Sequence, residues 1–141
     1  MKTFLLGISI SIICSISFFD LPTFNFNEEN DKDSFAIVQL FTSQGCSSCP
    51  SADILLEKVK KEYASENVAV LSYHVDYWNR LGWKDPFSKK EFTLLQNAYG
   101  FAFNSNRIYT PQAVINGKIH FVGSNESKMN GNLSKFLKKT C

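Results

Sequence analysis

Residues 35–50 read FAIVQLFTSQGCSSCP, and the architecture of this 141-residue chain can be worked out from them. The run Phe35 to Phe41 is apolar almost throughout, which is typical of a strand that is covered on both faces. Thr42 to Gly45 then form a turn, and the pair Cys46 and Cys49 stands where a helix is expected to begin. A helix start stabilises a thiolate, because its unpaired backbone N–H groups carry partial positive charge. The segment therefore predicts two reactive thiols at the end of a central strand.

The residues that follow predict a βαβ unit. From about Ser48 to Ala64, apolar residues recur at helical spacing, with acidic side chains early and lysines late, as the helix dipole prefers. Pro50 is compatible with the first turn of this helix, which needs no backbone donor. Asn67 to Val75 predicts a second buried strand, which a right-handed crossover would place parallel to the first.

The second half of the chain predicts a helix, a hairpin and a last helix. After a loop at residues 76–87, Ser88-Lys89-Lys90-Glu91 has the pattern of a capping box that opens a helix. Gln112 to Ile115 and Lys118 to Val122 predict two short strands, which the Asn116-Gly117 turn joins into a hairpin. The side chains expected to face the core are Phe92, Leu95, Ala98 and Tyr99 in the helix that follows Ser88, and Met129, Leu133, Phe136 and Leu137 in the last helix.

The element order β-α-β-α-β-β-α is that of the thioredoxin fold, with Cys-x-x-Cys opening the first helix and Pro111 opening the third strand. We therefore predict an α/β thioredoxin-like domain with a mixed sheet over residues 35–141. A composition of 44% hydrophobic and 20% charged residues suits one globular domain. The net charge of +2 is small and dispersed, which argues against a nucleic-acid partner.

The N-terminus has the pattern of a secretory signal. Residues 1–17 combine a positive start, an apolar core and the small residues of Ser15-Ile16-Ser17, where cleavage is expected. Residues 18–34 are rich in Asn, Asp and Glu without periodicity, which predicts a disordered tether. We expect an exported protein with no membrane contact beyond the signal segment. An uncleaved segment that anchors the protein is the alternative.

Cys46 and Cys49 are spaced so that their sulfurs can form a disulfide at a helix start. Cys46, the more exposed, is predicted to be the attacking thiolate, and Cys49 to resolve the mixed disulfide from one turn deeper. An inert structural disulfide is one alternative. A metal site is another, because Cys-x-x-Cys is half of a zinc site, although no second cysteine pair completes one. With Cys14 in the signal segment, Cys141 is left as a third thiol.

Thr110 and Pro111 form the second part of the predicted site. In this fold a proline at that point is typically cis and faces the two cysteines. The backbone before it can then pair with an extended substrate. A plain trans proline that opens a strand is the alternative, and the predicted topology argues against it.

His74 and Asp76 stand at the carboxyl end of the second predicted strand and would point the same way by strand alternation. They could form a proton relay or, with the two thiols, ligate a metal. Thiolate and imidazole together suit copper, so a copper chaperone using the cysteines and His74 is the alternative function. A histidine that closes a strand with an ordinary hydrogen bond explains the pattern equally well.

The predicted loop at residues 76–87 is aromatic. Tyr77, Trp78 and Trp83, with Thr110, could line a groove for a partner protein or a small substrate. Packing of the loop on the core is the commoner use of such side chains. If the groove alone carried function, the thiols would only stabilise it.

Three separated motifs in this order resemble one family. Residues 38–50 with Ala52-Asp53, residues 72–78 with 81–88, and residues 109–112 are similar to the secreted thioredoxin-like family catalogued as domain of unknown function twelve twenty-three. The resemblance implies a thioredoxin fold in an exported bacterial protein, in the periplasm or otherwise outside the cytoplasm. It implies no known substrate. Members of that family usually continue well beyond the residues matching Val122-Gly123.

The sequence thus predicts an exported thiol-disulfide oxidoreductase that acts through Cys46-Ser47-Ser48-Cys49. Its partners would be thiols or disulfides of proteins or small molecules. Its redox group would be the disulfide itself, with no other cofactor. The direction of electron transfer does not follow from the sequence, because Cys-x-x-Cys pairs span a potential range of roughly −270 to −120 mV.

Overall fold

The structure is a computed structural model that describes residues 34–137. Its elements are β1 (Ala36–Thr42), α1 (Pro50–Glu62), β2 (Val68–His74), the 3-10 helix η1 (Tyr77–Leu81), α2 (Lys90–Ala102), β3 (Gln112–Ile115), β4 (Ile119–Val122) and α3 (Glu126–Phe136). The predicted signal segment, the tether up to residue 33, Cys14 and Cys141 lie outside the described residues. The predicted element order is confirmed, with η1 as an addition inside the aromatic loop.

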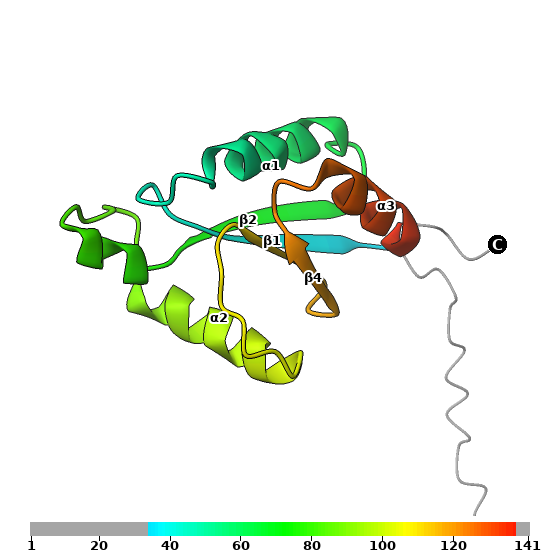
Figure 1. Cartoon of the computed structure of the whole chain (residues 1–141). Helices are drawn as coiled ribbons and strands as arrows, with labels where there is room; N and C mark the ends of the chain where they lie inside the picture. The colour runs from blue at the N-terminus through cyan, green and yellow to red at the C-terminus, as the bar shows by residue number, and fades with distance from the viewer. Residues whose placement is uncertain (1–33, 138–141) are drawn as a thin grey trace, which may run out of the picture. The chain divides into compact units, whose positions relative to one another are not determined.

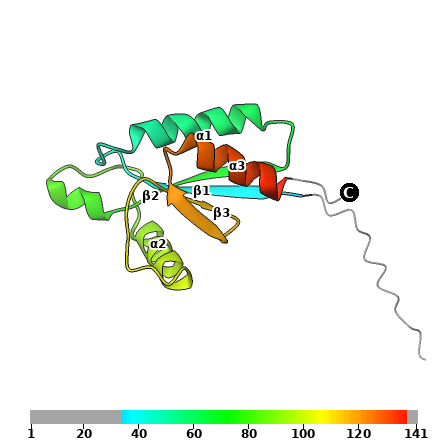
Figure 2. The same cartoon turned by 45° about the vertical axis from the view of Figure 1, so that its right-hand side comes forward.

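The sheet is mixed, as predicted, with strand order β2-β1-β3-β4. β1 is parallel to β2 and antiparallel to β3, and β4 returns antiparallel to β3. Helices α1 and α3 lie on one face of the sheet and α2 on the other (Figure 1 and, turned by 45°, Figure 2). This is a thioredoxin-like arrangement, in which the carboxyl end of β1 leads directly into the Cys-x-x-Cys turn.

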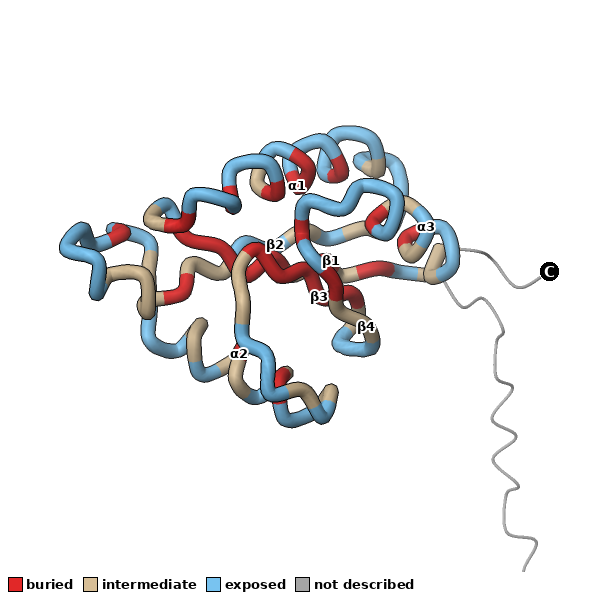
Figure 3. The backbone as a smooth tube through the Cα atoms, in the orientation of Figure 1, coloured by how far each residue is buried: buried red, intermediate tan, exposed pale blue. Residues whose placement is uncertain are grey.

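The core lies on both faces of β1, as a nearly continuous apolar strand requires. Leu40 and its neighbours pack beneath α1 and α3, whereas Phe41 packs on the other face against side chains of α2. Figure 3 shows the buried residues gathered along β1, β3 and the inner side of α1. The strand that leads into the cysteine turn is therefore packed on both faces.

The prediction of a second buried strand is wrong for β2. This strand lies at the edge of the sheet and alternates between half-buried and exposed residues, and Leu71 is 43% exposed. An apolar sequence predicts burial, but it does not show whether a neighbouring strand exists on each side.

Two details of α2 also differ from the prediction. The expected capping box does not form, because α2 begins at Lys90 after an extended Lys89, with no side-chain cap. The Ser88 hydroxyl instead donates to the carbonyl of Asp85 at 2.7 Å. Ala98, expected inside, is exposed, and the fully buried side chain of this helix is that of Gln96.

The predicted hairpin between β3 and β4 is confirmed. Asn116 and Gly117 both have positive φ, at 50° and 64°, as a two-residue turn of this kind requires. The Asn116 side chain also accepts the backbone N–H of Ile37 at 2.7 Å, which ties the hairpin to β1. Within residues 34–137, no helix combines the length and the apolar character needed to cross a membrane.

Candidate active site

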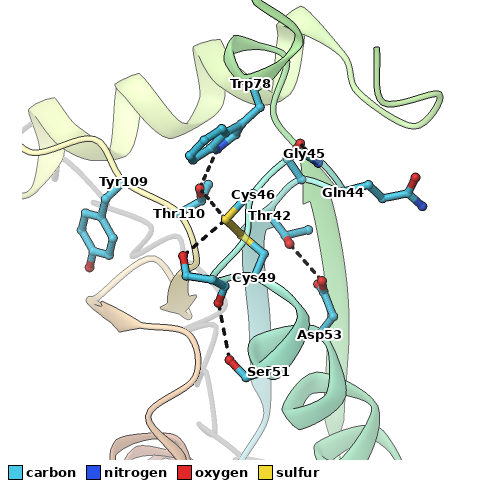
Figure 4. Close-up of a disulfide and its surroundings, with 12 residues drawn as sticks. Thr42, Gln44, Gly45, Cys46, Cys49, Ser51, Asp53, Trp78, Tyr109 and Thr110 are labelled. Carbon is cyan, nitrogen blue, oxygen red and sulfur yellow. Dashed lines mark hydrogen bonds between the residues drawn. A yellow bond between two sulfur atoms is a disulfide. The ribbon is translucent and has the colours of Figure 1, made fainter. Parts of the chain in front are cut away.

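Cys46 and Cys49 form a disulfide in the turn between β1 and α1 (Figure 4). Cys49 is the N-cap of α1, which begins at Pro50, so the bridge lies directly at the helix start. Cys46 is 2% exposed and Cys49 is fully buried. The order of exposure agrees with the prediction, although the margin is small, and both sulfurs are covered while they are joined.

The sulfur of Cys46 receives a hydrogen bond from another part of the chain. The Thr110 hydroxyl donates to Cys46 Sγ at 3.3 Å, and the indole N–H of Trp78 donates to the same hydroxyl at 2.8 Å. Figure 4 shows Trp78, Thr110 and Cys46 in line. The hydroxyl of Ser48 lies 3.5 Å from the same sulfur. Hydroxyl donors at this sulfur would stabilise it as a thiolate once the disulfide opens.

Pro111 closes the site from the side of β3. The Thr110-Pro111 bond is cis, as expected, and Pro111 is buried. The carbonyl of Pro111 accepts the backbone N–H of Gly123 at 2.9 Å. A Cβ at Gly123 would lie 2.5 Å from Leu40 Cδ1 and 3.3 Å from Pro111 Cβ, so a larger residue would force the Leu40 side chain to shift.

Asp85 anchors the turn that precedes the cysteines. Its buried carboxylate accepts the backbone N–H of Gln44 at 2.8 Å and lies 2.7 Å from His74 Nδ1. It also accepts from Ser43 Oγ at 3.4 Å and from the N–H of Phe87 at 2.9 Å. Burial by itself raises the pKa of this carboxyl, but the hydrogen bonds from Gln44, His74 and Phe87 outweigh it and hold the pKa below its usual value.

His74 and Asp76 do not share a site. His74 pairs with Asp85, whereas Asp76 accepts the hydroxyl hydrogen of Thr93 on α2. β2 ends at His74, so the strand alternation on which their common direction depended does not extend to Asp76. Across residues 34–137, no cluster of three or more His, Cys, Asp or Glu side chains is placed to hold a metal ion.

Asp53 brings a further carboxyl below the disulfide. It lies on α1 one turn after Cys49 and accepts the hydroxyl hydrogen of the buried Thr42 at 3.2 Å, as Figure 4 shows. Burial raises the pKa of Asp53, and the Thr42 hydrogen bond and the charge of His74 offset part of this effect. Asp53 therefore contacts β1 through Thr42, whereas His74 and Asp85 pair with each other.

The aromatic residues of the predicted groove differ in exposure. Trp78 and Tyr77 are half-buried and pack with Phe41, so they serve the core, and Trp78 also reaches the site through Thr110. Burial raises the pKa of the Tyr77 hydroxyl. Trp83 is 53% exposed, so it does not pack on the core as Tyr77 and Trp78 do.

The sequence interpretation did not assign a role to Asp85, Asp53, Thr42 or Gln96. Gln96 on α2 donates to the carbonyl of Tyr109 at 2.7 Å and to the side chain of Gln112 at 2.9 Å, which fixes the strand that carries Pro111. A single acid or amide in a loop or on a helix has no periodic signal. The motif residues of the family resemblance included Asp53 and Asp85, but nothing in the sequence said what they contact.

Comparisons with known proteins agree with this arrangement. The profile of a family described as Protein of unknown function (DUF1223) matches residues 37–140. The chain is similar to the crystal structure of a protein from Agrobacterium tumefaciens, with 46% identity over 72% of this chain and a TM-score of 0.66. It spans 44% of the length of that protein. The search of curated proteins found no match.

The chain is also similar to the crystal structure of the germline-specific thioredoxin Deadhead from Drosophila melanogaster. The identity is 19%, the matched region covers 73% of this chain and 82% of that one, and the TM-score is 0.49.

Proposed function

We propose that this chain, which belongs to the family described as Protein of unknown function (DUF1223), is a thiol-disulfide oxidoreductase. The observation that carries the proposal is the Thr110 hydroxyl at 3.3 Å from Cys46 Sγ, beside Pro111 and at the start of α1. A structural disulfide needs no donor at its sulfur, whereas an attacking thiolate is stabilised by one.

The reaction uses both cysteines in turn. The thiolate of Cys46 attacks one sulfur of a substrate disulfide, which forms a mixed disulfide and releases the other substrate sulfur as a thiolate. The thiolate of Cys49 then attacks the sulfur of Cys46, and the second substrate thiolate leaves. The two cysteines give up two electrons as their own disulfide forms, and the substrate disulfide takes them. An oxidase runs the same steps in reverse.

The buried carboxylate of Asp85 would support these steps by position. Asp85 holds the backbone of Gln44 and the ring of His74, so the turn that carries Cys46 cannot move freely. A fixed turn keeps the sulfur at the helix start and beside Thr110, which is where its thiolate is stabilised.

The test is thiol exchange by the purified protein with its N-terminus mapped. The reduced protein is mixed with a model disulfide, and the equilibrium of the Cys46/Cys49 pair with reduced and oxidised glutathione gives its potential and so its direction. In a Cys49→Ser variant, Cys46 should accumulate a mixed disulfide with the substrate. A Cys46→Ser variant should not, and it serves as the matched control.

Two results would contradict the proposal. One is the absence of exchange with any dithiol or disulfide. The other is stoichiometric binding of Cu(I) that is lost in Cys49→Ala, in a protein that shows no exchange, which would support the copper chaperone instead.

We also propose that the protein acts outside the cytoplasm. The support is the signal pattern of residues 1–17, which combines a positive start, an apolar core and small residues at the expected cleavage point. Expression of the full chain in a bacterium, followed by fractionation and N-terminal sequencing, tests this. A mature protein that begins near residue 18 in the periplasmic fraction is expected, and retention of Met1 in the membrane fraction would indicate the anchored form.

A further inference from the structure

A cavity with polar side chains in its largely apolar wall lies between β4 and the loop that leads to Pro111. It has a volume of about 270 Å³ and is lined by Ser105, Arg107, Tyr109, His120 and Val122. Three of these residues precede Thr110 in the loop, and two belong to β4. The sequence interpretation assigned no role to any of the five.

Tyr109 and His120 contact each other in this cavity, and their hydrogen bond can direct a ring N–H toward a ligand. The Tyr109 hydroxyl and His120 Nδ1 lie 3.1 Å apart, and a hydroxyl that donates to Nδ1 leaves the ring hydrogen on Nε2. The ring of His120 packs on Phe103, with centroids 4.7 Å apart, which fixes its orientation. Burial raises the pKa of Tyr109, so its hydroxyl keeps its hydrogen, although the charge of Arg107 offsets part of this effect.

The charge of the cavity is positive. Arg107 is exposed, and no Asp or Glu among residues 34–137 lies within ion-pair distance of its guanidinium. No acid lines the cavity. A guanidinium with an imidazole beside it matches the geometry and charge of a carboxylate, which can accept two N–H donors at once.

The cavity lies next to the redox site. Tyr109 directly precedes Thr110, whose hydroxyl is 3.3 Å from Cys46 Sγ. The β4 end of the cavity is tied to Pro111 through the hydrogen bond from the N–H of Gly123, which follows Val122. In Figure 4, Tyr109 lies on the same loop as Thr110 with its ring turned away from the sulfurs. A small molecule could therefore place its sulfur at Cys46 and a second group in the cavity.

From this arrangement we infer that Arg107, His120 and Tyr109 form a subsite for a carboxylate of the substrate, which is a small thiol or disulfide carrying acidic groups. The inference rests on the proposed function and names its substrate class. The carboxylate is held by Arg107 and the His120 ring, and the sulfur of the same molecule exchanges with Cys46.

The test compares two small disulfides as substrates of the reduced protein. Glutathione disulfide carries carboxylates, and bis(2-hydroxyethyl) disulfide carries none. We expect Arg107→Ala to lower the rate constant with glutathione disulfide about tenfold, the size of one charge-assisted contact at a partly exposed site. The rate with bis(2-hydroxyethyl) disulfide should not change, and Arg107→Lys should restore part of the lost rate.

Arg80→Ala is the matched control, because Arg80 is an exposed arginine on η1 that does not line the cavity. It removes the same charge and should leave both rates unchanged. An equal loss in Arg107→Ala with both disulfides, no loss with either, or the same loss in Arg80→Ala would overturn the inference.

A second measurement separates this inference from the proposed function. S-methylglutathione has the carboxylates but no reactive sulfur, so its binding to the disulfide form requires no exchange. We expect it to shift the NMR signals of the His120 ring in the native protein and not in Arg107→Ala. Unchanged His120 signals would overturn the inference even if exchange is observed. Binding without any exchange would retain the subsite and contradict the oxidoreductase.

Discussion

The Thr110 hydroxyl and Cys46 Sγ lie 3.3 Å apart although 64 residues separate them in the chain. A hydroxyl has one hydrogen, and here its oxygen is already occupied as acceptor by the indole N–H of Trp78 at 2.8 Å. The hydroxyl of Thr110 thus accepts from Trp78 and donates to the sulfur of Cys46. This relationship makes the reactivity of Cys46 depend on two residues outside the Cys-x-x-Cys motif.

Replacing Thr110 by Val removes this donor and keeps the shape. A hydrogen bond to a charged group contributes roughly 1.5–3 kcal/mol, so the thiolate of Cys46 should become less populated in Thr110→Val. We expect alkylation of the reduced protein by iodoacetamide at neutral pH to slow about tenfold at Cys46. Mass spectrometry of the labelled peptide checks the site. Thr110→Ser keeps the hydroxyl and should react at close to the native rate. If Thr110→Val is alkylated as fast as the native protein, the hydroxyl does not influence the reactivity of Cys46.

Asp85→Asn should destabilise the fold. The buried carboxylate accepts four hydrogen bonds, and an amide group cannot accept all of them, which should cost about 2–4 kcal/mol of unfolding free energy. Urea denaturation of the disulfide form measures this loss. Asp76→Asn is the control, because Asp76 is half-buried and accepts from Thr93 alone, so about 1 kcal/mol or less is expected.

The lowered pKa of Asp85 also predicts how the stability of the fold depends on pH. The folded protein holds the pKa of Asp85 below its ordinary value of 3.8, so this carboxylate stabilises the fold above pH 3.8. That stability is lost as the pH falls through the folded pKa. The difference between native protein and Asp85→Asn should therefore shrink as the pH falls below 3.8, and a constant difference would contradict this role.

Asp53→Asn should change stability at neutral pH in the opposite direction to Asp85→Asn. Burial raises the pKa of Asp53 above 3.8, so the folded state binds its proton more tightly than the unfolded state does. The native protein then loses stability as the pH rises from 3.8 through the folded pKa, and the amide variant does not. We expect Asp53→Asn to be more stable than the native protein at pH 7 and equal to it below pH 3.8. Denaturation midpoints at pH 3 and pH 7 test this, and a less stable variant at pH 7 would refute it.

Gly123→Ala should disturb the contact between β4 and Pro111. The new methyl group would meet Leu40 Cδ1 at 2.5 Å, and such overpacking costs about 1–3 kcal/mol. We expect a lower thermal midpoint and slower exchange at Cys46, since Pro111 must shift as well. Gly131→Ala in α3 has open space and should instead stabilise the helix by about 0.5–1 kcal/mol. Equal behaviour of the two variants would rule out the close packing at Gly123.

Much of the fold follows from local patterns in the sequence. The apolar run to Phe41, the helical spacing after Cys49 and the Asn116-Gly117 turn each determine an element through its own residues. Their order then restricts the topology to very few arrangements. The relation of Cys46 and Cys49 to Pro111 follows from that order, because both lie at the same end of adjacent strands.

What could not be predicted depends on contacts between distant residues. The sequence around Ser88 is compatible with a capping box and also with the hydrogen bond that the Ser88 hydroxyl donates to the Asp85 carbonyl. Only the path of the loop decides which of the two forms. His74 could have turned toward Asp76, but the buried carboxylate of Asp85 satisfies it. The buried Gln96 breaks the apolar pattern of α2 because its partners, Tyr109 and Gln112, come from another element.

Because β2 lies at the edge of the sheet, a further strand can pair with it. Val68–His74 contains no Asp, Glu, Lys, Arg or Pro, which are the residues that commonly protect the edge of a sheet, and it is paired within residues 34–137 only with β1. Its outer backbone groups can accept a further strand from any source, since such pairing depends on main-chain atoms rather than on sequence. A strand added there would widen the sheet on the side away from β3 and leave the contact between Thr110 and Cys46 unchanged. Structure can thus be added to this domain without rebuilding the turn that holds Cys46 and Cys49.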